Sequence, residues 1–156
     1  MKNSIKTILS KFTGTTLYLL RHGICCDFCR LMSANTASQR GQSTVIKCGN
    51  RILKKTERDS VAYQTALERV SDVKMRTHNF KGAAKGFQSS LDFYAQNSCD
   101  SSLLPRSIEY LSLCLASCYF NLGEREKTAE TIRTAVINGV SPETFDGLLE
   151  NNNKTS

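Results

Sequence analysis

SIEYLSLCLASCYFNLGEREKTAETIRTAVIN, residues 107–138, holds the clearest structural pattern of the chain. Its apolar side chains recur at steps of three or four, the spacing of one helical face, at Ile108, Leu111, Leu115, Tyr119 and Leu122. Gly123 then offers the left-handed backbone that ends many helices. A second stripe of the same period follows at Ala129, Ile132, Ala135 and Val136. The stretch predicts two antiparallel helices joined by a tight turn, with small residues at the closest approach: Ala116, Ala129 and Ala135.

A similar pair of stripes is predicted to begin near residue 59. Asp59 or Ser60 can cap the first helix, whose apolar face is Tyr63, Ala66, Leu67, Val70 and Val73. Thr77, His78 and Asn79 interrupt the pattern, and we expect His78 to be a solvated turn residue. The second stripe is Phe80, Ala83, Ala84, Phe87, Leu91 and Tyr94. Gly82 and Gly86 within it predict close backbone contact with a neighbouring helix.

The ends of the two helical pairs are also marked in the sequence. Residues 97–104 read as a loop, and Pro105 suits the first turn of the following helix. Ser141 and Pro142 start a last short helix, with Glu143 in its first turn. Its apolar face, Phe145, Leu148 and Leu149, predicts a cap over the end of the helices.

The charge of the chain is concentrated in its first third. Residues 1–58 contain eleven Lys or Arg and two acidic residues, a net charge of +9. Residues 59–156 contain ten basic and twelve acidic residues, a net charge of −2. With 156 residues, of which 40% are hydrophobic, the chain has room for one modest core. We therefore expect a largely disordered basic arm over residues 1–58, a helical domain over 59–150 and a disordered tail over 151–156.

Residues 1–20 have the composition of a mitochondrial transit peptide. Ile5, Ile8, Leu9 and Phe12 follow helical spacing, and no acidic residue precedes Asp27. Mitochondrial targeting is the prediction, and a cytoplasmic location is the alternative. The apolar run LYLL is far shorter than the roughly 20 residues that span a bilayer, so no transmembrane segment is expected.

Residues 21–30, RHGICCDFCR, carry the only suggestive metal or redox chemistry. Cys26 and Cys29 form a C-x-x-C motif, with His22 before it and Cys48 further on. A structural zinc site usually has two such pairs, and a redox motif usually follows a strand. We expect incidental cysteines and no metal or cofactor, with zinc binding, redox chemistry and palmitoylation of Cys25 and Cys26 as alternatives. The seven cysteines, an odd number, favour a reducing compartment.

Residues 31–50 are rich in polar residues and glycine, and we interpret them as a flexible linker. A short helix through Val45, Ile46, Ile52 and Leu53 is the alternative, although Cys48, Gly49 and Asn50 argue against its continuity. The basic run NRILKK, residues 50–55, has no aromatic neighbour that could stack on a base, and we interpret it as a solvated charge run.

An offset of 45 residues superposes the two helical pairs, with Val70 on Leu115, Ala83 on Thr128 and Phe87 on Ile132. The later copy contains Leu115-Ala116-x-x-Tyr119 followed by Gly123, and the earlier contains Ala83-x-x-x-Phe87 preceded by Phe80. These elements, over residues 60–142, resemble the tetratricopeptide repeat family. The resemblance implies an all-α fold of antiparallel helical hairpins, stacked as a short solenoid whose concave groove binds a peptide. Its structural repeat positions here would be Val70, Phe80, Ala83, Phe87, Leu115, Ala116, Tyr119, Gly123, Ile132 and Ala135.

The chain departs from the family in the length of its repeat and in the residues that some members use to bind an acidic peptide terminus. The family repeats every 34 residues or so, and we attribute the longer offset to the loop at 97–104 and a lengthened helix. Some members hold an acidic peptide terminus with basic residues on their first helices. The corresponding positions here offer no such clamp: Glu68, Asp72, Ser112 and Cys114.

No catalytic constellation accompanies these helices. The chain has two histidines, no glycine-rich phosphate loop and no nucleophile motif. The sequence therefore predicts a non-enzymatic adaptor, scaffold or assembly subunit that binds a protein or peptide partner, or associates with itself. The alternatives are an RNA-associated mitochondrial factor that uses the basic arm, and a small metal or redox protein that uses the C-x-x-C motif.

Overall fold

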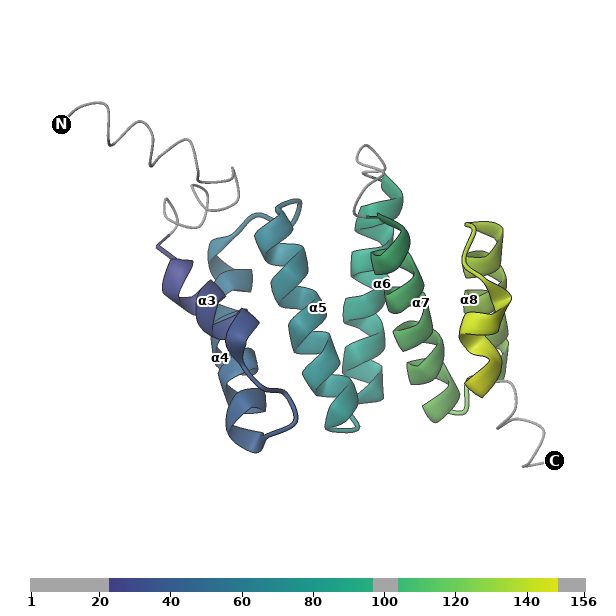
Figure 1. The fold of residues 1–156 in the computed structure, drawn as a ribbon, viewed down its shortest axis with the longest axis horizontal. Helices are drawn as coiled ribbons and strands as arrows, with labels where there is room; N and C mark the ends of the chain where they lie inside the picture. Colours follow the sequence, from purple (N-terminus) through teal and green to yellow (C-terminus); the bar gives the residue numbers. More distant parts are fainter. Residues whose placement is uncertain (1–22, 97–103, 149–156) are drawn as a thin grey trace. The chain divides into compact units, whose positions relative to one another are not determined.

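The computed structural model describes residues 23–96 and 104–148, and the regular structure within these ranges is helical throughout (Figure 1). The elements are α3 (Cys25–Ser33), α4 (Gln39–Lys55), α5 (Val61–Arg76), α6 (Phe80–Gln96), α7 (Leu104–Asn121), α8 (Arg125–Ile137) and the 3-10 helix η1 (Pro142–Phe145). The predicted all-α class is confirmed. The predicted targeting segment, the loop at residues 97–103 and the tail at 151–156 lie outside the described residues.

The chain divides into two compact units between Val70 and Ser71, within α5. The first unit contains α3, α4 and the first part of α5. The second unit contains the last turns of α5 with α6, α7, α8 and η1. This division lies further along the chain than residue 58, where the change in charge predicts it.

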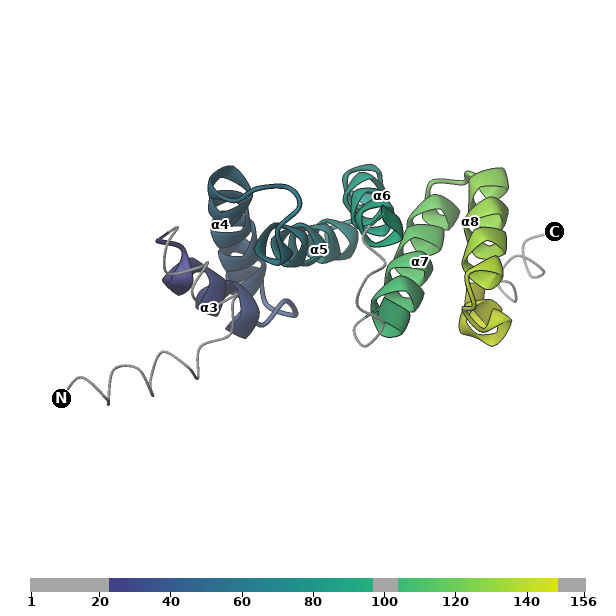
Figure 2. The same ribbon diagram turned by 90° about the horizontal axis from the view of Figure 1, so that it is seen from above.

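In the second unit, α6 packs against α7 and α7 packs against α8 (Figures 1 and 2). Phe87 of α6 is completely buried, and Leu115 of α7 is 2% exposed, as the two stripes predict. They belong to one apolar cluster, whose other members are Ala83, Ala84, Leu111, Cys114 and Cys118. The cluster forms because both helices present small residues beside large ones on the same face.

Local signals fix the ends of these helices as expected. Ser60 accepts a hydrogen bond from the backbone N–H of Tyr63 (3.2 Å) at the start of α5. His78 is exposed in the α5–α6 turn with a φ of 62°. Gly123 has a φ of 74° in the α7–α8 turn, where glycine avoids the strain that a side chain would bring.

The interpretation of Gly82 is wrong. A Cβ at residue 82 would meet the side chain of Asn79 at 2.8 Å, rather than another helix. Asn79 Oδ1 accepts a hydrogen bond from the backbone N–H of Gly82 (3.0 Å) and so caps α6. Gly82 leaves room for this cap, while Gly86 is buried within α6.

The predicted inner face of α8 is wrong at one position. Ala129 is exposed, and Thr128 is buried in its place. Thr128 Oγ1 donates a hydrogen bond to the carbonyl of Glu124 (3.0 Å), which satisfies the hydroxyl inside the protein. Leu122 also departs from the predicted stripe, because it lies in the turn and is 38% exposed.

The short η1 helix covers the end of the second unit, as predicted. Phe145 is completely buried and packs with Ala116 of α7, Ala135 of α8 and Val140. The two alanines allow α7 and α8 to approach closely, and Phe145 fills the space at their edge. Leu149 of the predicted face lies outside the described residues.

In the first unit, α3 and α4 form a helical hairpin that includes residues 31–50, the predicted flexible linker. That interpretation, and the prediction of a largely disordered arm, are wrong for residues 23–55. Ser38 caps α4 by accepting from the backbone N–H of Gly41 (3.0 Å). Val45, Cys48 and Ile52 then form a buried helical face.

Helix α4 runs without a break through Cys48, Gly49 and Asn50, against our expectation. A Cβ at residue 49 would overlap Cγ2 of Val70, so α4 and α5 lie in close contact at this glycine. The Arg69 guanidinium of α5 donates to the carbonyls of Leu31 (3.2 Å) and Ala34 (3.0 Å), which end α3. Contacts from α5 therefore stabilise the α3–α4 hairpin.

Replacing Gly49 with alanine should destabilise the first unit. The added methyl group meets the stiff side chain of Val70, and overpacking of this kind costs about 1–3 kcal/mol. Urea unfolding followed by circular dichroism measures the loss. The matched control is Gly147→Ala, because a Cβ at residue 147 meets nothing within 4 Å. Equal unfolding midpoints for the two variants would contradict the close approach of α4 and α5.

Candidate functional site

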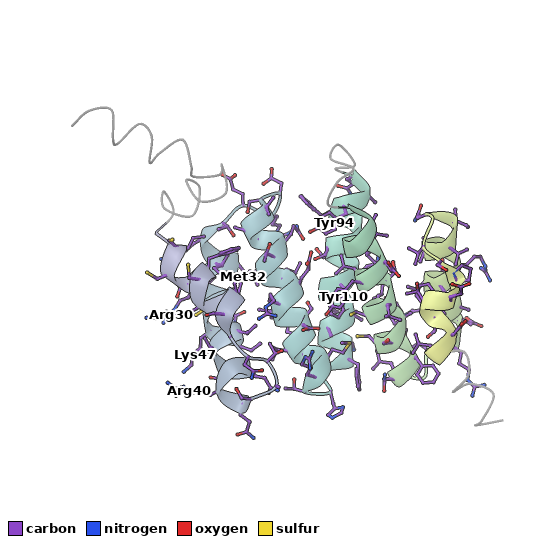
Figure 3. The ribbon with its side chains drawn as sticks, viewed as in Figure 1. Arg30, Met32, Arg40, Lys47, Tyr94 and Tyr110 are labelled. Carbon is purple, nitrogen blue, oxygen red and sulfur yellow. The ribbon has the colours of Figure 1, made fainter. Side chains whose placement is uncertain are left out.

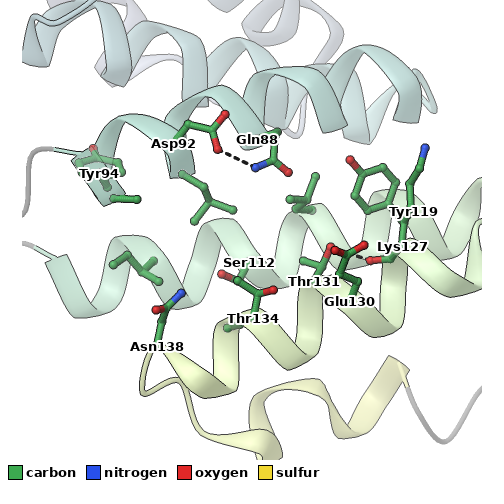
Figure 4. Close-up of a pocket in the computed structure, with 15 residues that line it drawn as sticks. Gln88, Asp92, Tyr94, Ser112, Tyr119, Lys127, Glu130, Thr131, Thr134 and Asn138 are labelled. Atoms are coloured by element: carbon green, nitrogen blue, oxygen red, sulfur yellow. Dashed lines mark hydrogen bonds between the residues drawn. The ribbon is translucent and has the colours of Figure 1, made fainter.

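A pocket with a volume of about 600 Å³ opens in the second unit between α6, α7 and α8 (Figure 4). Helix α7 forms its floor, with side chains at steps of three or four: Ile108, Ser112, Leu115 and Tyr119. Helix α6 forms one wall and α8 the other. The pocket exists because α7 packs on both neighbours and leaves a third face between them.

The pocket combines a buried floor with a polar rim. Ser112, Leu115 and Ala135 lie deepest, each no more than 3% exposed. The exposed residues around the opening are polar, except Ala95: Gln88, Asp92, Lys127, Glu130, Thr134 and Asn138. An apolar base with a few polar groups at its edge is typical of sites that bind a ligand or a peptide side chain.

The charges on the rim leave it net negative. Lys127 Nζ lies 2.6 Å from Glu124 Oε2, and 5.4 Å from the centre of the Tyr119 ring. The hydrogen bond to Glu124 and the negative charge of that carboxylate raise the pKa of Lys127. Asp92, on the opposite wall, accepts a hydrogen bond from Nε2 of Gln88 (2.8 Å). With Glu130, two carboxylates and one already paired ammonium line the pocket.

A second polar group joins α5 and α7 within the same unit. Tyr110 donates a hydrogen bond to Oδ1 of Asp72 (2.6 Å), and Arg76 Nε lies 3.6 Å from Oδ2 of Asp72. Burial and the hydrogen bond to Asp72 raise the pKa of Tyr110. Asp72 is only 8% exposed, and its hydrogen bond with Tyr110 joins α5 to α7. Cys114 is buried beside Tyr110 and Asp72.

Within the described ranges, the candidate metal ligands form no metal-binding group. Cys26 and Cys29 are exposed on α3, Cys48 is buried in α4, and His22 lies outside the described residues. The described ranges contain no group of three or more His, Cys, Asp or Glu residues that could hold a metal ion. Burial and the nearby Asp27 carboxylate raise the pKa of Cys48, whereas a nucleophilic or redox thiol needs a lowered one.

Cys114 and Cys118 are buried thiols of the α6–α7 core. Burial raises the pKa of Cys114 to about 11 and that of Cys118 to about 12. Their thiolate forms are therefore scarce at neutral pH, and packing accounts for both residues.

The predicted repeat positions lie on the packed faces rather than on the rim. Six of them are buried: Val70, Ala83, Phe87, Leu115, Ala116 and Ala135. Three are half-buried: Phe80, Tyr119 and Ile132. Only Leu115, Tyr119 and Ala135 also line the pocket. The sequence did not reveal the polar rim residues, because exposed polar side chains on a helix leave no periodic signal.

Comparisons of the chain with protein-family models, with curated proteins and with solved structures find no match. The fold and the pocket define it as an all-α protein with helical repeat-like architecture. Across residues 23–96 and 104–148, the helices fall short of the length and apolarity that a membrane span requires.

The cysteines should separate into two classes by reactivity. At about pH 8, a thiol with a pKa of about 11 is only about a thousandth thiolate, and burial hinders access further. We expect iodoacetamide to modify Cys114 and Cys118 at least ~100-fold more slowly in the folded chain than in urea. For the exposed Cys26 and Cys29, the rates of modification in the folded chain and in urea should differ by less than about tenfold. Peptide mass spectrometry measures each site, and modification of Cys114 as fast as Cys26 would contradict the packed core.

Proposed function

We propose that this chain is a non-enzymatic adaptor that binds a peptide segment of a partner protein in the α6–α8 pocket. The observation that carries the proposal is the open pocket of about 600 Å³ with its buried floor and polar rim. Three helices of one unit line it, so a ligand would contact a surface that the fold already holds in place.

The architecture supports a tetratricopeptide-like module as the scaffold. The α7–α8 hairpin turns at Gly123, and Ala83 and Phe87 of α6 pack in the shared core. The α3–α4 hairpin adds a further helical pair in a region where the sequence suggested none. Helices α4 and α6 start in the same way. In each, a side-chain oxygen (Ser38 Oγ or Asn79 Oδ1) accepts a hydrogen bond from the backbone N–H of the residue three positions later.

The pocket also suggests the chemistry of its occupant. Apolar side chains of a peptide would reach the floor at Leu115 and Ala135, which lie beneath the polar rim. Lys or Arg beside them would meet the Asp92 and Glu130 carboxylates.

Filling the pocket should abolish peptide binding. A random peptide library selected on the full chain should yield sequences with large apolar residues beside Lys or Arg. Thr134→Trp places a large side chain at the pocket rim, and we expect it to weaken the selected peptides at least ~10-fold, measured by fluorescence anisotropy. Arg133→Trp is the matched control, because Arg133 is exposed but does not line the pocket. Equal binding by both variants would reject the pocket as the site.

Mitochondrial location also belongs to the proposal, supported by the composition of residues 1–20. A fluorescent protein fused behind residues 1–40 should accumulate in mitochondria. Lys2, Lys6 and Lys11 supply the positive charge of the amphipathic segment, so replacing all three with Glu should leave the fusion in the cytoplasm. Cytoplasmic fluorescence of the unaltered fusion would favour the alternative location.

A further inference from the structure

The solvent face of α4 carries a continuous basic stripe. Arg40, Lys47, Arg51 and Lys54 are separated by seven, four and three residues, which places them on one side of the helix. All four are exposed, and the sequence of α4 contains no acidic residue. Only Arg51 and Lys54 of this stripe belong to the basic run at residues 50–55, and the helix adds Arg40 and Lys47 to them.

Helix α3 adds Arg30 to this stripe. Figure 3 shows Arg30, Lys47 and Arg40 projecting to the same side of the α3–α4 hairpin. Burial and Asp27 raise the pKa of the Cys48 thiol, while the positive charges of Arg51 and Arg30 act in the opposite direction. Both guanidinium groups therefore lie near the same point of α4. We call Arg30, Arg40, Lys47, Arg51 and Lys54 the basic face.

Little negative charge offsets the basic face. Asp27 Oδ1 lies 3.3 Å from Arg51, and the Arg51 side chain is still 61% exposed. Within the described part of the chain, the ion pairs include no carboxylate partner for Arg30, Arg40, Lys47 or Lys54. Such an array attracts a polyanion, because each Lys or Arg that contacts a phosphate releases a counterion condensed on that phosphate.

The residues around the stripe discriminate between polyanions. A helix that binds a membrane surface inserts an apolar face. Met32 of α3 is 51% exposed, but it is a single apolar side chain. The exposed residues of α4 are all polar: Gln39, Arg40, Ser43, Lys47, Asn50, Arg51, Lys54 and Lys55. A single-strand site usually stacks bases on aromatic rings, and α4 has none. Contacts to the backbone of a duplex need neither feature.

We infer that the basic face binds the phosphate backbone of double-stranded nucleic acid without reading its sequence. From Arg40 to Lys54 the helix rises roughly 21 Å, which matches about six base-pair steps of one strand. The site lies in the first unit and is separate from the peptide pocket, so neither proposal depends on the other.

The test measures how the affinity of the full chain for a DNA duplex of about 20 base pairs depends on salt. Fluorescence anisotropy is recorded over a series of NaCl concentrations. The variant Arg40→Gln, Lys47→Gln, Lys54→Gln removes three phosphate contacts, and circular dichroism checks that its helices remain. Each lost contact reduces the slope of log affinity against log salt by about 0.9. We therefore expect the slope to fall by about 2.7 for the triple variant.

The matched control removes the same charge from exposed positions of the second unit: Lys81→Gln, Lys85→Gln and Arg133→Gln. This variant should keep the slope of the unaltered chain. An equal fall in both variants would show that net charge, rather than the basic face, governs binding. Failure to bind the duplex, together with binding of phosphatidylserine vesicles that the first triple variant abolishes, would replace nucleic acid with a membrane surface.

Discussion

The burial of Phe87 between α6 and α7 is the interaction on which the second unit depends. Ala83 and Ala84 let the helices approach, and Phe87 with Leu111 and Leu115 fills the space between them. Complete burial of a side chain of this size contributes about 1.5–3 kcal/mol. Helix α7 packs against α8 on another side, through Ala116 and Ala135. The face of α7 left between the two contacts becomes the floor of the pocket, so the site is a direct consequence of the packing.

Helices α5, α6, α7 and α8 could be predicted from the sequence, because each has a periodic apolar stripe and the helix joined to it by a short connection has one too. The turns at His78 and Gly123, the Ser60 cap and the buried Phe145 follow from local chemistry that a short window contains. The exchange of Ala129 for Thr128 shows the limit of this reasoning. Hydrophobicity favours alanine inside, but α8 starts at Arg125 with a register that turns residue 128 inward. The Glu124 carbonyl then satisfies the threonine hydroxyl.

The α3–α4 hairpin was missed because its defining contacts join residues far apart in the sequence. Gly49 reads as a helix breaker in isolation, yet it is the residue that allows Val70 to approach α4. Likewise, Arg69 satisfies the carbonyls that end α3, and nothing within residues 31–50 reveals this partner. Polar and glycine-rich composition predicts a linker only when no neighbouring helix can use the small residues for close packing.

The two surfaces of the chain differ in the forces that they can exert on a partner. The basic face has exposed cations and no apolar base, so its attraction must weaken steeply as salt screens the charges. The α6–α8 pocket has a buried floor and only a few charges, so burial of apolar area supplies most of its affinity and salt changes it little. The two sets of residues belong to different units and share no side chain, so a change of salt concentration distinguishes the two proposed kinds of binding.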